Sequence, residues 1–245
     1  MANRLIRTSF VAIAAATLLI QAAAFAKDDS AKELAARLNA HYQKVQTLQA
    51  VFLERYSEGN GSVRVESGTV FFRRPGQMRW EYEAPEEKLF LSDGKRVWFY
   101  VPADRAVTRM PIKESADWRT PLALLTGKAN LSRLCSRIDL VEGAPAAPGN
   151  QVLRCLPKGE KRDVASTEQG DLSAGEDFTE VLLEIASTTG ELSRIQIRQP
   201  GGVELEYRFG GWKQNLRLPE ELFRFQVPPG VAIVDGGAQA ASTSR

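Results

Sequence analysis

Short apolar runs separated by tight turns fill residues 75–102, which read PGQMRWEYEAPEEKLFLSDGKRVWFYVP. In the run 77–82 apolar and charged residues alternate, which is typical of a strand with one buried face. Asp93 and Gly94 then form a two-residue hairpin signal. Because strands joined by such short turns pair with their neighbours, the segment predicts consecutive antiparallel hairpins. The apolar residues are mostly aromatic, which raises the question of what this face covers.

The same pattern extends over most of the chain. Runs bounded by Gly, Pro and Asp predict strands at 49–56, 63–73, 77–82, 88–91, 96–101, 106–110, 132–141, 151–156, 179–186, 191–199, 203–209 and 222–227. Residues 120–127, TPLALLTG, have the apolar cluster and glycine stop of a short helix, and 159–177 is a polar excursion. Because composition does not shift along residues 27–245, we expect one domain built on a single curled antiparallel sheet.

Residues 30–45 have the period of an amphipathic helix. Ser30 and Glu33 stand at the spacing of a capping box, whose side chains satisfy free amides at a helix start. One apolar stripe follows at helical spacing, made of Leu34, Leu38, Tyr42 and Val45. Such a helix must cover an apolar surface, either the sheet itself or a ligand cavity. His41, beside the stripe, is predicted to be a surface residue.

The first 26 residues have the pattern of a secretory signal. A basic start precedes an apolar stretch over 10–24, and Ala24 and Ala26 are small residues at the positions that a signal peptidase reads. The apolar stretch is too short for a membrane span. We therefore expect cleavage after residue 26 and a mature chain from about Lys27. No Cys lies near this point, so a lipidated N-terminus is not expected.

The mature chain would be nearly neutral. Loss of Arg4 and Arg7 brings the 32 Lys and Arg of the full sequence level with its 30 Asp and Glu. Because nucleic-acid binding usually needs a basic excess, no nucleic-acid partner is expected.

The two cysteines, Cys135 and Cys155, lie in strand-like runs on either side of the turn segment GAPAAPGN. Two strands of one hairpin would bring them within reach of each other. In an oxidising compartment we expect a structural disulfide between them.

Catalytic motifs are missing from the sequence. His41 is the one histidine, which leaves little material for a histidine triad or a histidine-rich metal site. No phosphate-binding glycine motif occurs. The pairs 86–87 and 220–221 are adjacent glutamates of the kind found at solvated turns, with use of some carboxylate pair in glycoside hydrolysis as the alternative. We expect a protein that is not an enzyme, without catalytic residues, metal or cofactor.

Four stretches, RRPGQMRWEY, LSDGKRVWFYVP, TPLALL and LRLPEELFRFQVPPGVAIVD, together resemble the LolA family of lipoprotein carriers from Gram-negative bacteria. The resemblance covers nearly all of the mature chain. It implies an incomplete β-barrel covered by an α-helical lid, with a cavity that holds lipoprotein acyl chains in the periplasm. It also implies triacylated lipoproteins as cargo, an inner-membrane ATP-binding-cassette transporter as donor and a LolB-like outer-membrane receptor as acceptor. We expect a monomer.

This resemblance implies that the aromatic face binds acyl chains. Exposing an acyl chain to water costs about 0.8 kcal/mol per methylene, and rigid aromatic rings offer a large apolar surface in exchange. The candidate cavity residues are Phe52, Met78, Trp80, Tyr82, Phe90, Trp98 and Tyr100 on the sheet, and Leu34, Leu38, Leu122 and Leu125 on the lid. Sequence neighbours in a strand point to opposite faces, so the choice between Leu89 and Phe90, or Trp98 and Phe99, stays open.

Arg74, in the Arg-Pro step, matches the family arginine that latches the lid and lets cargo move on. Its guanidinium can donate to several carbonyl oxygens at once. The alternatives are a solvated turn residue at this position, or the same role for the adjacent Arg73.

Three features depart from the family pattern. Met78 stands where an aromatic residue is expected, and neither the Cys135–Cys155 pair nor the polar segment 159–177 belongs to the family core. A periplasmic carrier of another lipid or glycolipid, or a sensing module of the RseB type, is therefore the alternative on the same scaffold.

Overall fold

The computed structural model describes residues 30–112, 125–127, 130–158 and 179–236. The predicted signal over 1–26, Leu122 and the whole of the predicted excursion 159–177 lie outside these residues. Within the described ranges, none of the helices combines the length and the apolar character needed to span a membrane.

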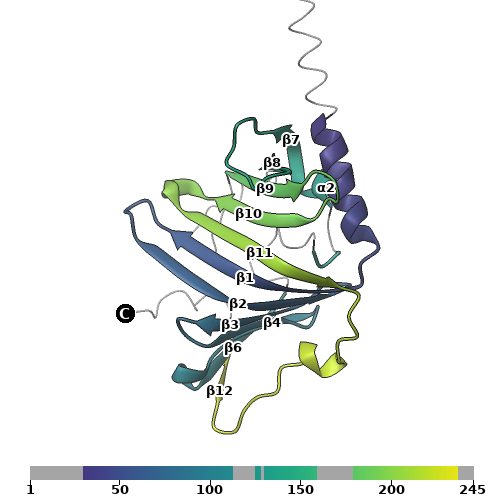
Figure 1. Ribbon diagram of the computed structural model, residues 1–245. Coiled ribbons are helices and arrows are strands. Elements are labelled where there is room, and N and C mark those ends of the chain that lie inside the picture. The colour runs from purple at the N-terminus through teal and green to yellow at the C-terminus, as the bar shows by residue number, and fades with distance from the viewer. Residues whose placement is uncertain (1–29, 113–124, 128–129, 159–178, 237–245) are drawn as a thin grey trace, which may run out of the picture.

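One curled sheet forms most of this structure (Figure 1). In sheet order its twelve strands are β12 (Ala232–Asp235), β6 (Ala106–Pro111), β5 (Arg96–Val101), β4 (Lys88–Ser92), β3 (Gln77–Ala84), β2 (Val63–Arg73), β1 (Thr47–Ser57), β11 (Glu204–Gln214), β10 (Leu192–Arg198), β9 (Glu180–Ala186), β8 (Asn150–Pro157) and β7 (Cys135–Leu140). Neighbours pair antiparallel except β12 and β6, which are parallel. The predicted mainly-β fold with a single curled sheet is confirmed.

The pairing of β1 with β11 joins the two halves of the sheet. Its register runs from Leu48 opposite Gln214 to Ser57 opposite Glu204, and it shifts once between Gln49 and Val51. The extra residue lies on β11 beside Gly211, whose φ of +63° suits a bulge. Because a bulge increases local twist, it helps to curl the sheet at the junction of the two halves.

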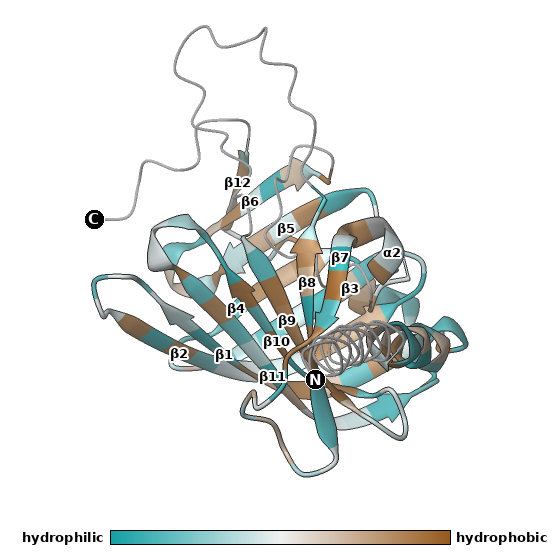
Figure 2. Cartoon of the chain, turned by 90° about the horizontal axis from the view of Figure 1, so that it is seen from above, coloured by the Kyte–Doolittle hydropathy of each residue, from teal (hydrophilic) through white to brown (hydrophobic). Residues whose placement is uncertain are grey.

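Alternation along the strands separates two faces, visible in Figure 2 as alternating brown and teal residues. The inner face, defined here as the one that carries Trp80, belongs to one large core cluster with residues from both halves of the sheet. The outer face carries a small second cluster around Leu91, Trp98 and Val107. Strands β4 to β6 therefore contribute to apolar clusters on both sides of the sheet.

The N-terminal helix, residues 30–43, packs against the large core cluster at one end of the sheet (Figure 1). The predicted stripe is confirmed, because Leu34, Leu38, Tyr42 and the following Val45 are all buried. The other helical pieces are single turns, namely α2 (Leu131–Leu134) and the 3₁₀ segments η1 (Pro102–Asp104), η4 (Pro200–Gly202) and η5 (Glu220–Phe223).

The strand predicted at 222–227 is wrong. This stretch begins inside η5 and continues without strand pairing, and the final strand is β12 instead. The alternating Phe223 and Phe225 that suggested a strand are anchors on the outer face: Phe223 lies under the guanidinium of Arg73, and Phe225 stacks on Trp98. Residues 215–231 thus form a strap from β11 to β12 across the outer face, drawn in yellow in Figure 1.

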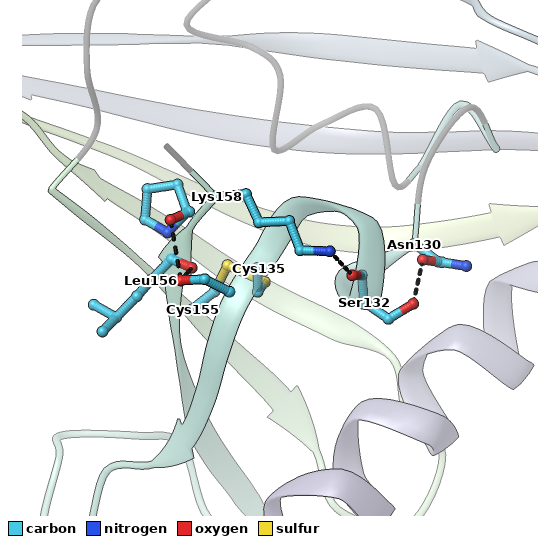
Figure 3. The surroundings of a disulfide bond; sticks show 8 residues. Asn130, Ser132, Cys135, Cys155, Leu156 and Lys158 are labelled. Atoms are coloured by element: carbon cyan, nitrogen blue, oxygen red, sulfur yellow. Dashed lines mark hydrogen bonds between the residues drawn. A yellow bond between two sulfur atoms is a disulfide. The ribbon is translucent and has the colours of Figure 1, made fainter. Parts of the chain in front are cut away.

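The predicted disulfide is confirmed, since Cys135 and Cys155 are bonded with their Cα atoms 5.4 Å apart. The strand predicted at 132–141 is partly wrong, because its first residues belong to α2, whose turn leads straight into Cys135. Figure 3 shows how this turn is held: the amine of Lys158 donates to the carbonyl oxygen of Ser132 at 2.7 Å. The disulfide therefore fastens the edge strand β7 to β8.

Gly68 lies in β2 at the point where the register of its pairing with β3 shifts. A Cβ at this position would stand 1.8 Å from the backbone oxygen of Glu81. Only glycine permits this approach, because a backbone carbonyl in a sheet cannot swing aside as a side chain can.

We predict that Gly68→Ala lowers the free energy of unfolding by about 3 kcal/mol or more, as overpacking against rigid backbone does. Gly210→Ala is the matched control in β11, where the nearest atom is a Val51 methyl at 3.6 Å. Its effect should stay within about 1 kcal/mol. Urea unfolding followed by tryptophan fluorescence measures both values, and equal losses would contradict the close approach at Gly68.

Replacing both Cys135 and Cys155 by Ala should lower the free energy of unfolding by about 3 kcal/mol, because the bridge closes a loop of about 20 residues. The measurement is urea unfolding of the variant beside the oxidised wild type. If the wild type unfolds at the same urea concentration with and without reductant, the bridge does not stabilise this edge.

Candidate functional site

Trp80 is the centre of the aromatic face. Its ring centroid lies 4.8 Å from that of Phe52, 5.9 Å from that of Phe72 and 5.2 Å from that of Tyr207. The rings meet edge-on or tilted, which is the arrangement that aromatic quadrupoles favour. Three neighbouring strands and β11 supply this cluster, so its geometry is fixed by the sheet register.

The structure brings most of the predicted sheet residues together on the inner face. Those that are buried members of one cluster are Phe52, Met78, Trp80, Tyr82 and Phe90. From the other side, Leu34 and Leu38 of the N-terminal helix and Leu125 join the same cluster. Leu122 lies outside the described residues.

Trp98 and Tyr100 were expected on this face, and the structure places them on the opposite one. Trp98 pairs across strands with Leu91, whereas Phe90 pairs with Phe99. Because directly paired residues share a face, Phe99 accompanies Phe90 on the inner side and Trp98 points outward. There the rings of Trp98 and Tyr100 lie 5.2 and 5.6 Å from that of Phe225.

Sequence reasoning missed several inner-face rings. Phe72, Tyr207 and Phe209 are buried around Trp80, and the alternation in LEYRF at 205–209 is the signal that could have identified the last two. Phe99, which the sequence left open as the alternative to Trp98, also lies on this face. The side chain of Phe99 is 38% exposed. It therefore presents a large apolar surface to solvent on the inner face of β5.

The inner face becomes polar toward one end of β1 to β4. The hydroxyl of Tyr82 donates to the buried carboxylate of Glu54 at 2.7 Å. Glu66, opposite Glu54 in the strand register, forms an ion pair with Lys88. The apolar part of the face is therefore bounded by the helix at one end and by these polar pairs at the other.

The N-terminal helix is fastened to the β9–β11 half of the sheet. The hydroxyl of Tyr42 accepts a hydrogen bond from the backbone amide of Leu192 at 3.0 Å. Burial raises the pKa of Tyr42 above its ordinary value, so this hydroxyl stays neutral. His41 was predicted at the surface, but it is partly buried, and its ring nitrogens contact the backbone oxygen of Thr189 and the side-chain amide of Gln214.

Arg74 lies at the turn between β2 and β3, beside the segment 125–127. The backbone amide of Gly76 donates to the oxygen of Thr126 at 3.0 Å. Gly127 approaches so closely that a Cβ there would be 2.8 Å from Cδ of Arg74. Burial lowers the pKa of Arg74, and the nearby Tyr42 partly opposes this shift.

Arg73 and Arg74 point to different partners. The guanidinium carbon of Arg73 lies 4.8 Å from the ring centroid of Phe223, and a guanidinium nitrogen donates to the backbone oxygen of Leu218 in the strap. Of the two arginines, Arg74 is therefore the one in contact with the residues that follow TPLAL.

Comparison with known proteins places these features in a family. Residues 43–226 match the family model described as outer membrane lipoprotein carrier protein LolA. An outer-membrane lipoprotein carrier protein of Pseudomonas paraeruginosa is 31% identical over 233 residues, which cover 94% of this chain and 99% of the relative. One from Nitrosospira multiformis is 26% identical, with coverage of 80% and 86%.

Among solved structures, an uncharacterized conserved protein from Thermus thermophilus has a similar fold, with a TM-score of 0.51 and 16% identity. The similarity covers 84% of this chain and 99% of the other. Together with the family match over most of the curled sheet, the sequence relatives decide the assignment: the chain belongs to the LolA family of outer-membrane lipoprotein carrier proteins.

Proposed function

We propose that this protein is a periplasmic carrier that binds the acyl chains of lipoproteins released from the inner membrane and delivers them to an outer-membrane receptor. The observation that carries this proposal is the aromatic inner face, which ends in the exposed ring of Phe99. Membership of the LolA family supports the choice of lipoproteins as cargo.

The physical need for such a face is large. A single acyl chain transferred from a membrane to water costs on the order of 10 kcal/mol, at about 0.8 kcal/mol per methylene. A carrier must replace this burial with its own apolar surface while remaining folded when empty. The rings around Trp80 are held by four strands, so the surface persists without cargo.

The donor and acceptor belong to the same proposal. An inner-membrane ATP-binding-cassette transporter would supply the energy for release of triacylated lipoproteins, since the sequence has no nucleotide-binding motif of its own. A LolB-like receptor would accept the cargo at the outer membrane. The proposal includes cleavage after residue 26 and export to the periplasm, and the Cys135–Cys155 bridge supports it because disulfides persist in oxidising compartments.

Mass spectrometry of the mature protein, purified gently from the periplasm, tests the cargo. The expected result is co-purified triacylated lipoprotein. Recovery of free phospholipid or glycolipid would instead identify a carrier of another lipid. A protein that is reproducibly empty, and that takes up no lipoprotein, would contradict a carrier function and favour a sensing module.

We predict that Phe99→Ser weakens binding of a fluorescent palmitate analogue about tenfold, because it removes apolar contact area worth on the order of 1.5 kcal/mol. Val51→Ser is the matched control, since Val51 is also an exposed apolar strand residue, at 58%, but lies on the outer face. It should bind within about twofold of wild type. Equal affinities for both variants would exclude the inner face at Phe99 as a binding surface.

Arg74→Leu should impair delivery of cargo. In the proposed latch the guanidinium of Arg74 donates hydrogen bonds to backbone oxygens of the lid, and such charge-assisted bonds contribute about 1.5–3 kcal/mol each. Losing the guanidinium should therefore disfavour closure of segment 125–127 at least about tenfold and leave lipoprotein trapped on the carrier. Transfer of a labelled lipoprotein to outer-membrane vesicles that carry the receptor measures this effect. Arg96→Leu, at an exposed strand position, is the control. Wild-type transfer by Arg74→Leu would refute the latch.

A further inference from the structure

Gly127 occupies a position where a side chain would be strained and would have to push the end of Arg74 aside. Its φ is +74°, in the left-handed region that side chains rarely adopt. A Cβ built there meets Cδ and Nε of Arg74 at 2.8 Å and Cζ at 3.0 Å. The glycine Cα thus lies directly against the aliphatic end and the guanidinium of Arg74.

The residues before Gly127 are seated firmly. Leu125 is fully buried in the large core cluster, and Thr126 is buried beside it. The carbonyl oxygen of Thr126 accepts the 3.0 Å hydrogen bond from the amide of Gly76. One apolar anchor, one backbone hydrogen bond and one close contact with Arg74 therefore hold this short segment against the β2–β3 turn.

Arg74 is partly buried between Gly127 and Tyr42. It lies close enough to Tyr42 for the two side chains to affect each other's pKa, and Tyr42 is itself fixed by the amide of Leu192 and by the ring of Trp212. A side chain at position 127 would have to displace either Arg74 or the segment that carries it.

We propose that Gly127 is the positioning residue that lets segment 125–127 close on Arg74, so that the closed state requires glycine at this position. If segment 125–127 closes less often, apolar cargo should enter faster, so a side chain at 127 should speed uptake. This consequence rests on the proposed carrier function. The closure itself is a property of the empty protein and can be measured without any cargo.

The test compares two alanine variants. Gly127→Ala introduces both left-handed strain and the clash with Arg74. Gly143→Ala introduces similar strain, at a φ of +66°, but its Cβ would meet no atom within 4 Å. Hydrogen exchange of the Gly76 amide, followed by NMR, reports directly on the bond to Thr126.

Exchange at Gly76 should be at least about tenfold faster in Gly127→Ala than in wild type, and unchanged in Gly143→Ala. In the Arg74→Ala background, Gly127→Ala should accelerate exchange less than it does in wild type, because the clashing atoms are gone and only the left-handed strain remains. Unchanged exchange at Gly76 in Gly127→Ala, or the same acceleration in both backgrounds, would overturn the proposal.

Uptake of the fluorescent palmitate analogue separates this inference from the proposed function. Faster uptake by Gly127→Ala, with wild-type uptake by Gly143→Ala, supports both. Faster exchange at Gly76 with equal uptake by wild type and Gly127→Ala overturns the gating consequence. Faster exchange with no uptake by any variant supports the closure and contradicts the carrier function. Unfolding curves for each variant ensure that the comparison is made between folded proteins.

Discussion

The burial of Trp80 among the rings of Phe52, Phe72 and Tyr207 is the contact on which the inner face depends. The four rings come from β1, β2, β3 and β11, so they meet only when the strands are in register and the sheet is curled. Aliphatic side chains of the same area would adapt to many arrangements. Flat rings packed edge to face fix one arrangement, and with it the shape of the surface on either side.

Much of this could be read from the sequence, and the errors have physical reasons. Alternation placed Trp80 and Tyr82 correctly because period-2 patterning is a local property, but it left the choice between Leu89 and Phe90 open. It could not say whether Trp98 or Phe99 joined them, because that choice depends on the cross-strand register. Phe223 and Phe225 misled for a related reason: an alternating pair of rings can anchor a strap on a sheet as well as form a strand. The contact between Gly127 and Arg74 joins distant segments and left no local signal.

The two sides of the candidate site are attached differently. The N-terminal helix is bound to the β9–β11 half through hydrogen bonds of Tyr42 and His41. Gly190 also lies so close to the helix backbone that a Cβ there would be 2.6 Å from the oxygen of Arg37. Segment 125–127 is bound to the β2–β3 turn on the other half. Relative movement of these covers therefore need not disturb the aromatic cluster, whose strands are continuous between the halves.

The long-range pairing of β1 with β11 has a consequence for the order of folding. Leu48 in β1 pairs with Gln214 in β11. Trp98 is covered on the outer face by Phe225, which is also far along the chain. Contacts between residues so far apart in sequence form slowly. A chain still emerging from the ribosome lacks the last strands, so it has no finished sheet to collapse into. This delay postpones the joining of the two halves of the sheet until the last strands have been synthesised.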